Sequence, residues 1–269
     1  MNRLANRRLS RTEKDRDGQM VRKPRYGNWV SKRLIYAPGV VSLVSLGLAP
    51  LYPVFVIPAV SFFLVALYFA YARYQFAPQG GNVQDRVVDL VMAQLDWNGE
   101  GQALDIGCGN AALTIKVAQK YTRARVMGID YWGGNWEYSK NMCERNAKIE
   151  GVNERVAFQK ASASALPFTD GYFDAVVSNL VFHEVSDAAD KREVVREALR
   201  VIKKGGKFAF QDLFLLKRTY GDIDDLLAAI RSWGIRRVEF VETRKATFIP
   251  LALKLPFMVG TIGIITGEK

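Results

Sequence analysis

The sequence predicts an α/β domain with a mostly parallel sheet and helices on both faces, preceded by an N-terminal hydrophobic helical hairpin. The length of 269 residues accommodates one such domain with an appendage, and 49% apolar residues are enough for a sizeable core. The uncharged run 34–72 predicts the hairpin. From residue 82 onward, strand patterns and helix patterns alternate, which predicts the sheet.

The first 33 residues form a basic tail. They contain eleven Lys or Arg and three acids, so they carry +8 of the net charge of +11. Because the tail lacks apolar periodicity, we expect it to be largely without regular structure, either solvated or lying on an anionic surface. The rest of the chain is nearly neutral, so a basic nucleic-acid-binding face and a nucleic-acid partner are not expected.

Residues 34–72 contain no charged side chain, histidine or amide side chain over 39 positions. As helix the run would measure about 58 Å, roughly twice the thickness of a bilayer core. Pro50 and Pro53 break it, which predicts two helices over Leu34–Ala49 and Val54–Ala72. A signal peptide and a buried core hairpin are the alternatives, although a signal peptide has a much shorter apolar region. The basic tail should stay on the cytoplasmic side of the membrane.

The predicted domain boundaries follow from these changes in composition. The tail covers 1–33, the transmembrane or re-entrant hairpin 34–73, a linker 74–81 and the α/β domain 82–269. Asn82 is expected to cap the first domain helix. The predicted helices are Val83–Trp97, Ala111–Tyr121, Trp136–Glu150, Ala188–Ile202 and Ile223–Trp233. The predicted strands are Ala103–Gly107, Arg125–Asp130, Val156–Ala161, Ala175–Asn179 and Lys207–Leu213, then Arg237–Thr243 and Gly260–Thr266 as a closing antiparallel pair.

A glycine turn follows the first predicted strand of the domain. The pattern Gly107-x-Gly109-x-x-Ala112, with Asp130 about twenty residues beyond, fits a dinucleotide fingerprint, so a nicotinamide site is one interpretation. Asp105 favours a second interpretation, a ligand that carries an ammonium group, because a carboxylate at this position suits a positive charge better than a pyrophosphate. The chain also lacks a Tyr-x-x-x-Lys pair for hydride transfer.

Cysteine and histidine are scarce in this chain. Cys108 and Cys143 are the two cysteines and His183 is the single histidine, so no disulfide framework and no bound metal are expected. Two unpaired thiols are typical of a reducing cytoplasm.

Four segments in order resemble the motifs of class I S-adenosylmethionine-dependent methyltransferases. They are Leu104–Ala111, Val126–Asp130, Ala165–Ser178 and Leu199–Lys207. The resemblance covers residues 82–269 and implies a Rossmann-like methyltransferase sheet, with S-adenosylmethionine as the methyl donor. A cytosolic cofactor implies that the domain lies on the same side as the basic tail, which requires an even number of crossings or a re-entrant hairpin.

The resemblance also implies roles for particular residues. Asp105 would hold the methionine ammonium group, and Gly107 and Gly109 would let the backbone approach the cofactor. Asp130 would accept hydrogen bonds from both ribose hydroxyls, and Tyr131 would lie beside the adenine, although simple packing of Tyr131 is the alternative.

Further cofactor contacts are expected after the third and fourth domain strands. Ser162 stands where many relatives have an aspartate that accepts from the adenine amino group, which puts that contact in doubt, while Ala163 offers its backbone amide. Asn179 would face the place where the methyl group is transferred. His183 is either a general base or a packing residue, and methyl transfer often requires only in-line positioning.

The hairpin suggests a small, lipophilic methyl acceptor, such as a quinone, an isoprenoid or a lipid headgroup. A soluble small molecule or protein as acceptor, with the hairpin used only for location, is the first alternative. A non-catalytic S-adenosylmethionine-binding membrane scaffold is the second. The apolar segment 246–258 either packs in the core or forms a wall of the acceptor pocket.

Overall fold

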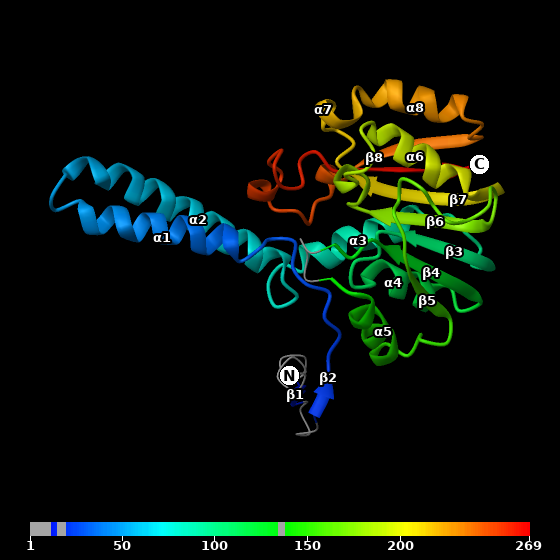
Figure 1. Cartoon of the computed structure of the whole chain (residues 1–269), viewed down its shortest axis with the longest axis horizontal. Helices are drawn as coiled ribbons and strands as arrows, with labels where there is room; N and C mark the ends of the chain where they lie inside the picture. Colours follow the sequence, from blue (N-terminus) through cyan, green and yellow to red (C-terminus); the bar gives the residue numbers. More distant parts are fainter. Residues whose placement is uncertain (1–11, 15–19, 134–137) are drawn as a thin grey trace.

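The computed structural model describes residues 12–14, 20–133 and 138–269. A sheet domain carries helices on both faces, and a helical hairpin projects away from it (Figure 1). The predicted fold class is therefore confirmed: an α/β Rossmann-like domain, with a pair of N-terminal helices before it.

The central sheet has seven strands in the order β5-β4-β3-β6-β7-β9-β8. The first five strands in this order, from β5 across to β7, are parallel. Strand β9 runs antiparallel between β7 and β8, which confirms the predicted closing pair. The strands are β3 (Gly101–Ile106), β4 (Ala124–Asp130), β5 (Val156–Lys160), β6 (Phe173–Asn179), β7 (Ile202–Asp212), β8 (Arg237–Glu242) and β9 (Gly263–Glu268).

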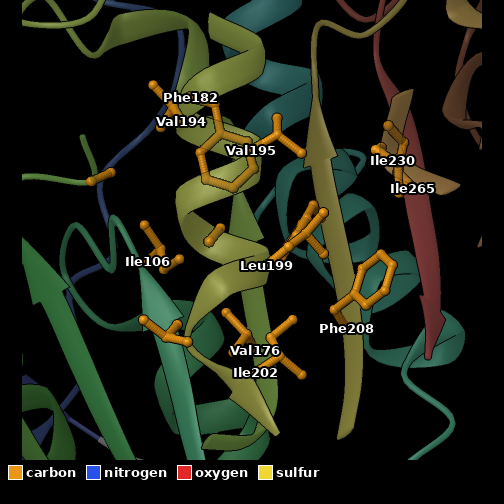
Figure 2. Packing of buried hydrophobic residues seen from close by; sticks show 14 of the residues in the cluster. Ile106, Val176, Phe182, Val194, Val195, Leu199, Ile202, Phe208, Ile230 and Ile265 are labelled. Atoms are coloured by element: carbon orange, nitrogen blue, oxygen red, sulfur yellow. The ribbon is translucent and has the colours of Figure 1, made fainter. Parts of the chain in front are cut away.

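Helices cover both faces of the sheet, because successive side chains along each strand point alternately into two cores. Leu104 and Ile106 of β3 pack with helices α6 and α8, whereas Ala103 packs on the opposite face with α3, α4 and α5. Figure 2 shows the first of these cores, with Phe182 and Phe208 among its side chains. The domain helices are α3 (Val83–Gln94), α4 (Ala112–Lys120), α5 (Lys140–Ile149), α6 (Lys191–Arg200), α7 (Lys217–Tyr220) and α8 (Ile223–Ser232).

The hairpin consists of α1 (Arg33–Leu48) and α2 (Val56–Phe76), which pack side by side. Ser42 Oγ donates to the carbonyl of Ala59 at 2.8 Å, and a 3-10 turn beginning at Pro53 starts the return helix. Helix α2 continues beyond its predicted end at Ala72, into the predicted linker.

The helices of the hairpin differ in length. Among the described helices, Pro53–Phe76 alone is long and apolar enough to cross a membrane by length and composition, and Arg33–Leu48 is shorter. Only 6% of the most apolar 18-residue window of the longer helix is buried, so α2 is not the core helix of the domain.

The basic tail is more ordered than predicted. Strands β1 (Thr12–Lys14) and β2 (Met20–Arg22) pair antiparallel, and the rest of the tail before them and between them lies outside the described residues. Residues 23–32, called the strap below, run along the domain, where Trp29 packs on Phe76 with ring centroids 5.6 Å apart. Aromatic packing orders this segment despite its charge.

A third, smaller core joins the hairpin to the domain. It contains Val30 of the strap, Phe76 of α2, Val87 of α3, and Leu253 and Ile262 of the segment between β8 and β9. The predicted apolar segment 246–258 therefore packs partly inside this joint, while Leu251 and Phe257 stay 84% and 66% exposed.

Several predicted boundaries need correction. Asn82 does not cap α3 through its side chain, because its backbone is left-handed with φ of 50° and its amide instead donates to Asp85 Oδ2 at 3.3 Å. Strand β7 begins five residues before its predicted start at Lys207, because Ile202 already pairs with Phe173 of β6. The register then shifts before the pair Ala175 and Lys207. Helix α5 begins at Lys140, and the predicted start at Trp136 lies outside the described residues.

Candidate functional site

A cavity of about 940 Å³ opens at the carboxyl ends of β3, β4 and β6. Parallel α/β sheets bind ligands at this edge, and ligand pockets commonly measure about 300–1,000 Å³. All eight predicted cofactor residues line it, together with His183. We call it the main cavity.

Asp105, near the end of β3, is a carboxyl group buried in the wall of the main cavity. It is 1% exposed, and Thr114 of α4 donates a hydrogen bond to its Oδ2 at 2.6 Å. Burial raises the pKa of Asp105 to about 7, against the lowering effect of the hydrogen bond from Thr114. A positively charged ligand group beside it would stabilise the ionised form.

The glycine turn after β3 has left-handed backbone at both glycines, with φ of 71° at Gly107 and 56° at Gly109. A Cβ atom on Gly107 would lie 2.0 Å from the Val181 side chain, so this glycine is required by packing between the β3 and β6 turns. A Cβ atom on Gly109 would meet nothing closer than Tyr138 at 3.5 Å. Such an atom would therefore lie at ordinary contact distance from the Tyr138 ring, and the left-handed backbone of Gly109 is the reason that glycine is favoured there.

Asp130, the last residue of β4, holds two turns together. Gly109 N donates to its Oδ2 at 2.9 Å and Trp132 N to its Oδ1 at 2.7 Å. Each carboxylate oxygen has a second lone pair for a ligand hydroxyl. Tyr131 lies at the rim, 64% exposed, with Lys160 Nζ 4.8 Å from its ring centroid.

Ser162 and Ala163 follow β5, as predicted, and a third residue that the sequence did not indicate joins them. The hydroxyls of Ser162 and Ser164 both donate to Asp187 Oδ2, at 2.8 and 2.7 Å. These hydrogen bonds lower the pKa of Asp187. A carboxylate thus lies in the cavity wall beside Ser162, supplied by the loop after β6.

Asn179 and His183 line the cavity where β6 ends. The Oδ1 atom of Asn179 is buried and has no hydrogen-bond partner within the described part of the chain. His183 Nδ1 lies 2.7 Å from Oδ1 of Asp212, the last residue of β7, which is fully buried. The sequence analysis missed Asp212, because nothing local marks it.

The cavity also reaches the hairpin. Tyr26 and Trp29 of the strap, Phe69 and Phe76 of α2, and Phe257 line it together with the predicted cofactor residues. Tyr26 and Trp29 are aromatic residues inside a basic tail, and this pair was the sequence signal that could have indicated that the strap packs on the domain.

The wall of this cavity fits S-adenosylmethionine. The buried Asp105 carboxyl and the unpartnered Asn179 oxygen suit the ammonium group, and Asp130 at a strand end suits the ribose hydroxyls.

Comparison with known proteins identifies the family. The family described as "Methyltransferase domain" matches residues 104–210. The ubiquinone/menaquinone biosynthesis C-methyltransferase UbiE of Desulfotalea psychrophila is 33% identical over 205 residues, which cover 67% of this chain and 78% of that protein. The chain belongs to the class I S-adenosylmethionine-dependent methyltransferases, and S-adenosylmethionine is its methyl donor. The nicotinamide alternative is thereby set aside.

Two further relatives set the extent of this likeness. Methyltransferase GfsG of Streptomyces halstedii is 28% identical over 146 residues, and the match spans 54% of this chain but about half (48%) of that relative. The solved structure of the [4+2]-cyclase SpnF superposes with a TM-score of 0.51 at 24% identity, covering 69% of this chain and 80% of that one. At this identity the superposition shows the fold alone.

Proposed function

We propose that the protein methylates a small, lipophilic acceptor that enters the main cavity from a lipid bilayer holding the hairpin. The observation that carries this proposal is the continuity of the cavity. Its walls run from Asp105 and Asp130 to Phe69 and Phe76 of α2 and to Phe257. An acceptor could therefore pass from the base of the hairpin to the cofactor without crossing water.

The exposed surface of the hairpin supports membrane insertion. Large apolar side chains along both helices are exposed, among them Leu43 at 70%, Ile57 at 67% and Leu64 at 58%. Soluble monomers rarely expose contiguous apolar surface of this extent. We infer that these helices insert, with the tail and the domain both on the cytoplasmic side.

The segment between β8 and β9 continues this apolar surface onto the domain. Tyr68 of α2 donates to the carbonyl of Ala252 at 2.9 Å, and its ring lies 5.9 Å from that of Phe257. Leu251, which is exposed, and Phe257, which lies partly exposed at the rim of the main cavity, are placed beside the hairpin base and would meet lipid. The relative UbiE is named as a ubiquinone/menaquinone biosynthesis C-methyltransferase, which supports a lipophilic acceptor here but does not fix the atom that is methylated.

The cofactor roles remain part of the proposal. Asp105 would pair with the ammonium group, Asp130 would accept from the ribose hydroxyls, and Tyr131 would lie beside the adenine. Asp187, next to Ser162, would accept from the adenine amino group in place of the aspartate that Ser162 replaces. Bound S-adenosylmethionine supplies an electrophilic methyl carbon.

The experiment follows a labelled methyl group. The full chain in vesicles made from a lipid extract of its source cells is given methyl-labelled S-adenosylmethionine, and an aqueous extract is tested in parallel. We expect label in the lipid fraction. Replacing both Leu251 and Phe257 with Ser should lower lipid labelling about tenfold, since their apolar contacts are lost. Cofactor affinity should stay unchanged.

Two controls make this result interpretable. Leu51→Ser changes an equally exposed apolar residue at the far end of the hairpin and should leave labelling unchanged. Asp130→Ala should weaken cofactor binding roughly ten- to hundredfold, since hydrogen bonds to charged groups contribute about 1.5–3 kcal/mol, and labelling at subsaturating cofactor should fall by a similar factor. Label confined to the aqueous extract would support the soluble-acceptor alternative. No label in either extract would support the scaffold alternative.

A further inference from the structure

The turn after β6 is held by one buried carboxylate. Asp212 Oδ2 accepts from Val181 N at 3.0 Å and from Phe182 N at 2.8 Å. Its Oδ1 accepts from Leu213 N at 2.6 Å and faces His183 Nδ1 at 2.7 Å. Because three backbone N–H groups donate to this side chain, Asp212 acts as a hydrogen-bond acceptor toward its neighbours. An acceptor beside Nδ1 fixes the proton of a neutral His183 ring on that nitrogen.

This arrangement leaves Nε2 as the basic nitrogen of His183. His183 lines the main cavity, and its side chain is 22% exposed. Glu184 Oε1 lies 3.8 Å from Nε2 and also belongs to a cavity-lining residue. A base held in one tautomer, beside a carboxylate that stabilises its protonated form, is the arrangement that proton transfer requires.

We propose that His183 is the general base of the transfer and that the acceptor carries a hydroxyl group whose oxygen is methylated. The proposal rests on the proposed function, because it names the accepting atom for the same cavity. Asp212 acts as a positioning residue. A hydroxyl needs such a base because its oxygen is weakly nucleophilic while it keeps its proton, whereas a neutral amine already offers a lone pair. Methylation at carbon also releases a proton to a base, so the identity of the labelled product distinguishes oxygen from carbon.

The hydroxyl oxygen forms a bond to the methyl carbon as the bond from that carbon to the sulfonium sulfur breaks. The electron pair of the broken bond returns to sulfur, which loses its positive charge. The hydroxyl proton passes to His183 Nε2 and later to water at the cavity mouth. The products are a methyl ether, S-adenosylhomocysteine and one proton.

The groups around His183 determine the pH dependence. Burial lowers the pKa of His183, but the hydrogen bond and charge of Asp212, with Glu184, outweigh that effect and the opposing charge of Lys191, so the pKa is raised. Only the neutral ring accepts a proton. The turnover rate should therefore rise with pH through a midpoint above the ordinary value of about 6.5.

The first test is spectroscopic and needs no acceptor. Because the chain has one histidine, imidazole nitrogen resonances of the ¹⁵N-labelled full chain in detergent belong to His183 alone. We expect the neutral form to carry its proton on Nδ1, with a titration midpoint above 6.5. A neutral ring with its proton on Nε2 would overturn the proposal.

The second test uses methyl-labelled S-adenosylmethionine and the lipid-extract vesicles described above. His183→Asn keeps a side-chain N–H for Asp212 but has no basic nitrogen. We expect turnover to fall about 100-fold or more, the acid limb of the pH profile to disappear, and cofactor affinity to stay unchanged. Added imidazole should restore part of the rate. Glu193→Gln, on the exposed face of α6, is the matched control and should behave as the native protein.

The outcomes separate this inference from the proposed function. Labelled lipid with equal turnover in His183→Asn would overturn the inference and leave the lipophilic acceptor standing. Label on carbon or nitrogen, resistant to ether cleavage, would also overturn it. If only the aqueous extract is labelled, the lipophilic acceptor is wrong, and the same variant tested on that labelled pool decides the role of His183.

Discussion

Ionising a carboxyl group inside a protein is costly, and we propose that the ammonium group of the cofactor offsets that cost at Asp105. Its side chain is buried, with Thr114 as hydrogen-bond donor, and its pKa is raised to about 7. In the unfolded chain the same carboxyl group ionises at its ordinary, lower pKa. Asp105 therefore contributes stability that is fully present below the unfolded pKa and is lost as pH rises through about 7.

Cofactor binding should have the opposite pH dependence. If the ammonium group binds beside ionised Asp105, affinity rises as pH rises through about 7 and levels off above it. Between pH 8 and pH 6 we expect S-adenosylmethionine affinity to fall roughly tenfold. Near pH 7, binding of the cofactor should release protons from the enzyme, because it favours ionised Asp105. Titration calorimetry in buffers of different ionisation enthalpy measures both quantities.

The variant Asp105→Asn isolates this contribution from the titration of His183. An asparagine keeps an oxygen that can accept from Thr114, but it has no charge to gain. Its cofactor affinity should be low and nearly independent of pH between 6 and 8. If the variant retains the native slope, another group is responsible and the role of Asp105 is refuted.

At the residue scale, sequence reasoning found the cavity residues that belong to contiguous motifs. Gly109 and Asp130 each follow a recognisable strand, so their position at the sheet edge could be predicted. Asp187 and Asp212 could not be found this way, because each lies in an unremarkable local sequence. Their roles arise only when the fold brings them to Ser162 and His183.

At the element scale, the strap is the part of the chain that the sequence predicted least well. Asn146 of α5 is fully buried and holds the strap to the glycine turn after β3. Its amide donates to the carbonyls of Arg25 at 3.0 Å and Asn110 at 2.9 Å, and its oxygen accepts from Arg25 N at 2.9 Å. Charge suggested a solvated tail, whereas backbone hydrogen bonds to one asparagine and the packing of Trp29 fix the segment.

Asn146→Ala should therefore loosen the strap and the glycine turn after β3 together. It removes the partner of the buried Asn110 carbonyl and of two partly buried backbone groups of Arg25, which costs about 1–3 kcal/mol at the buried carbonyl and less at Arg25, where water can enter. We expect a lower thermal midpoint, faster hydrogen exchange in residues 23–32, and cofactor affinity reduced severalfold. Asn153→Ala, at an exposed position nearby, is the matched control. Unchanged exchange in the strap would refute this coupling.

At the scale of the whole molecule, the joint between hairpin and domain lies at one wall of the main cavity. Within the hairpin, the cavity is lined by Leu34, Phe69 and Phe76, which all lie at its base. The sequence predicted two helices there because proline interrupts an uncharged run. It could not predict that their base would contact the cofactor cavity, because that contact depends on the strap and on the β8–β9 segment, which are remote in sequence.

This division of the hairpin into a base and a distal part leads to an experiment in which the distal part is exchanged. Residues 40–64 are replaced either by an unrelated apolar two-helix hairpin or by a short polar loop, and the base is kept in both. None of the replaced residues lines the cavity. The apolar replacement should therefore methylate lipid in vesicles within about threefold of the native rate, since it restores the effective concentration that anchoring provides.

The polar-loop protein should behave differently, because it keeps the cavity wall but lacks the apolar surface that we propose inserts into the bilayer. We expect S-adenosylmethionine affinity equal to that of the native chain and lipid methylation reduced by roughly tenfold to a hundredfold, since the acceptor must then be found by diffusion. Raising the vesicle concentration should recover part of the difference. Native lipid methylation by the polar-loop protein would mean that insertion of the hairpin plays no part in supplying the acceptor.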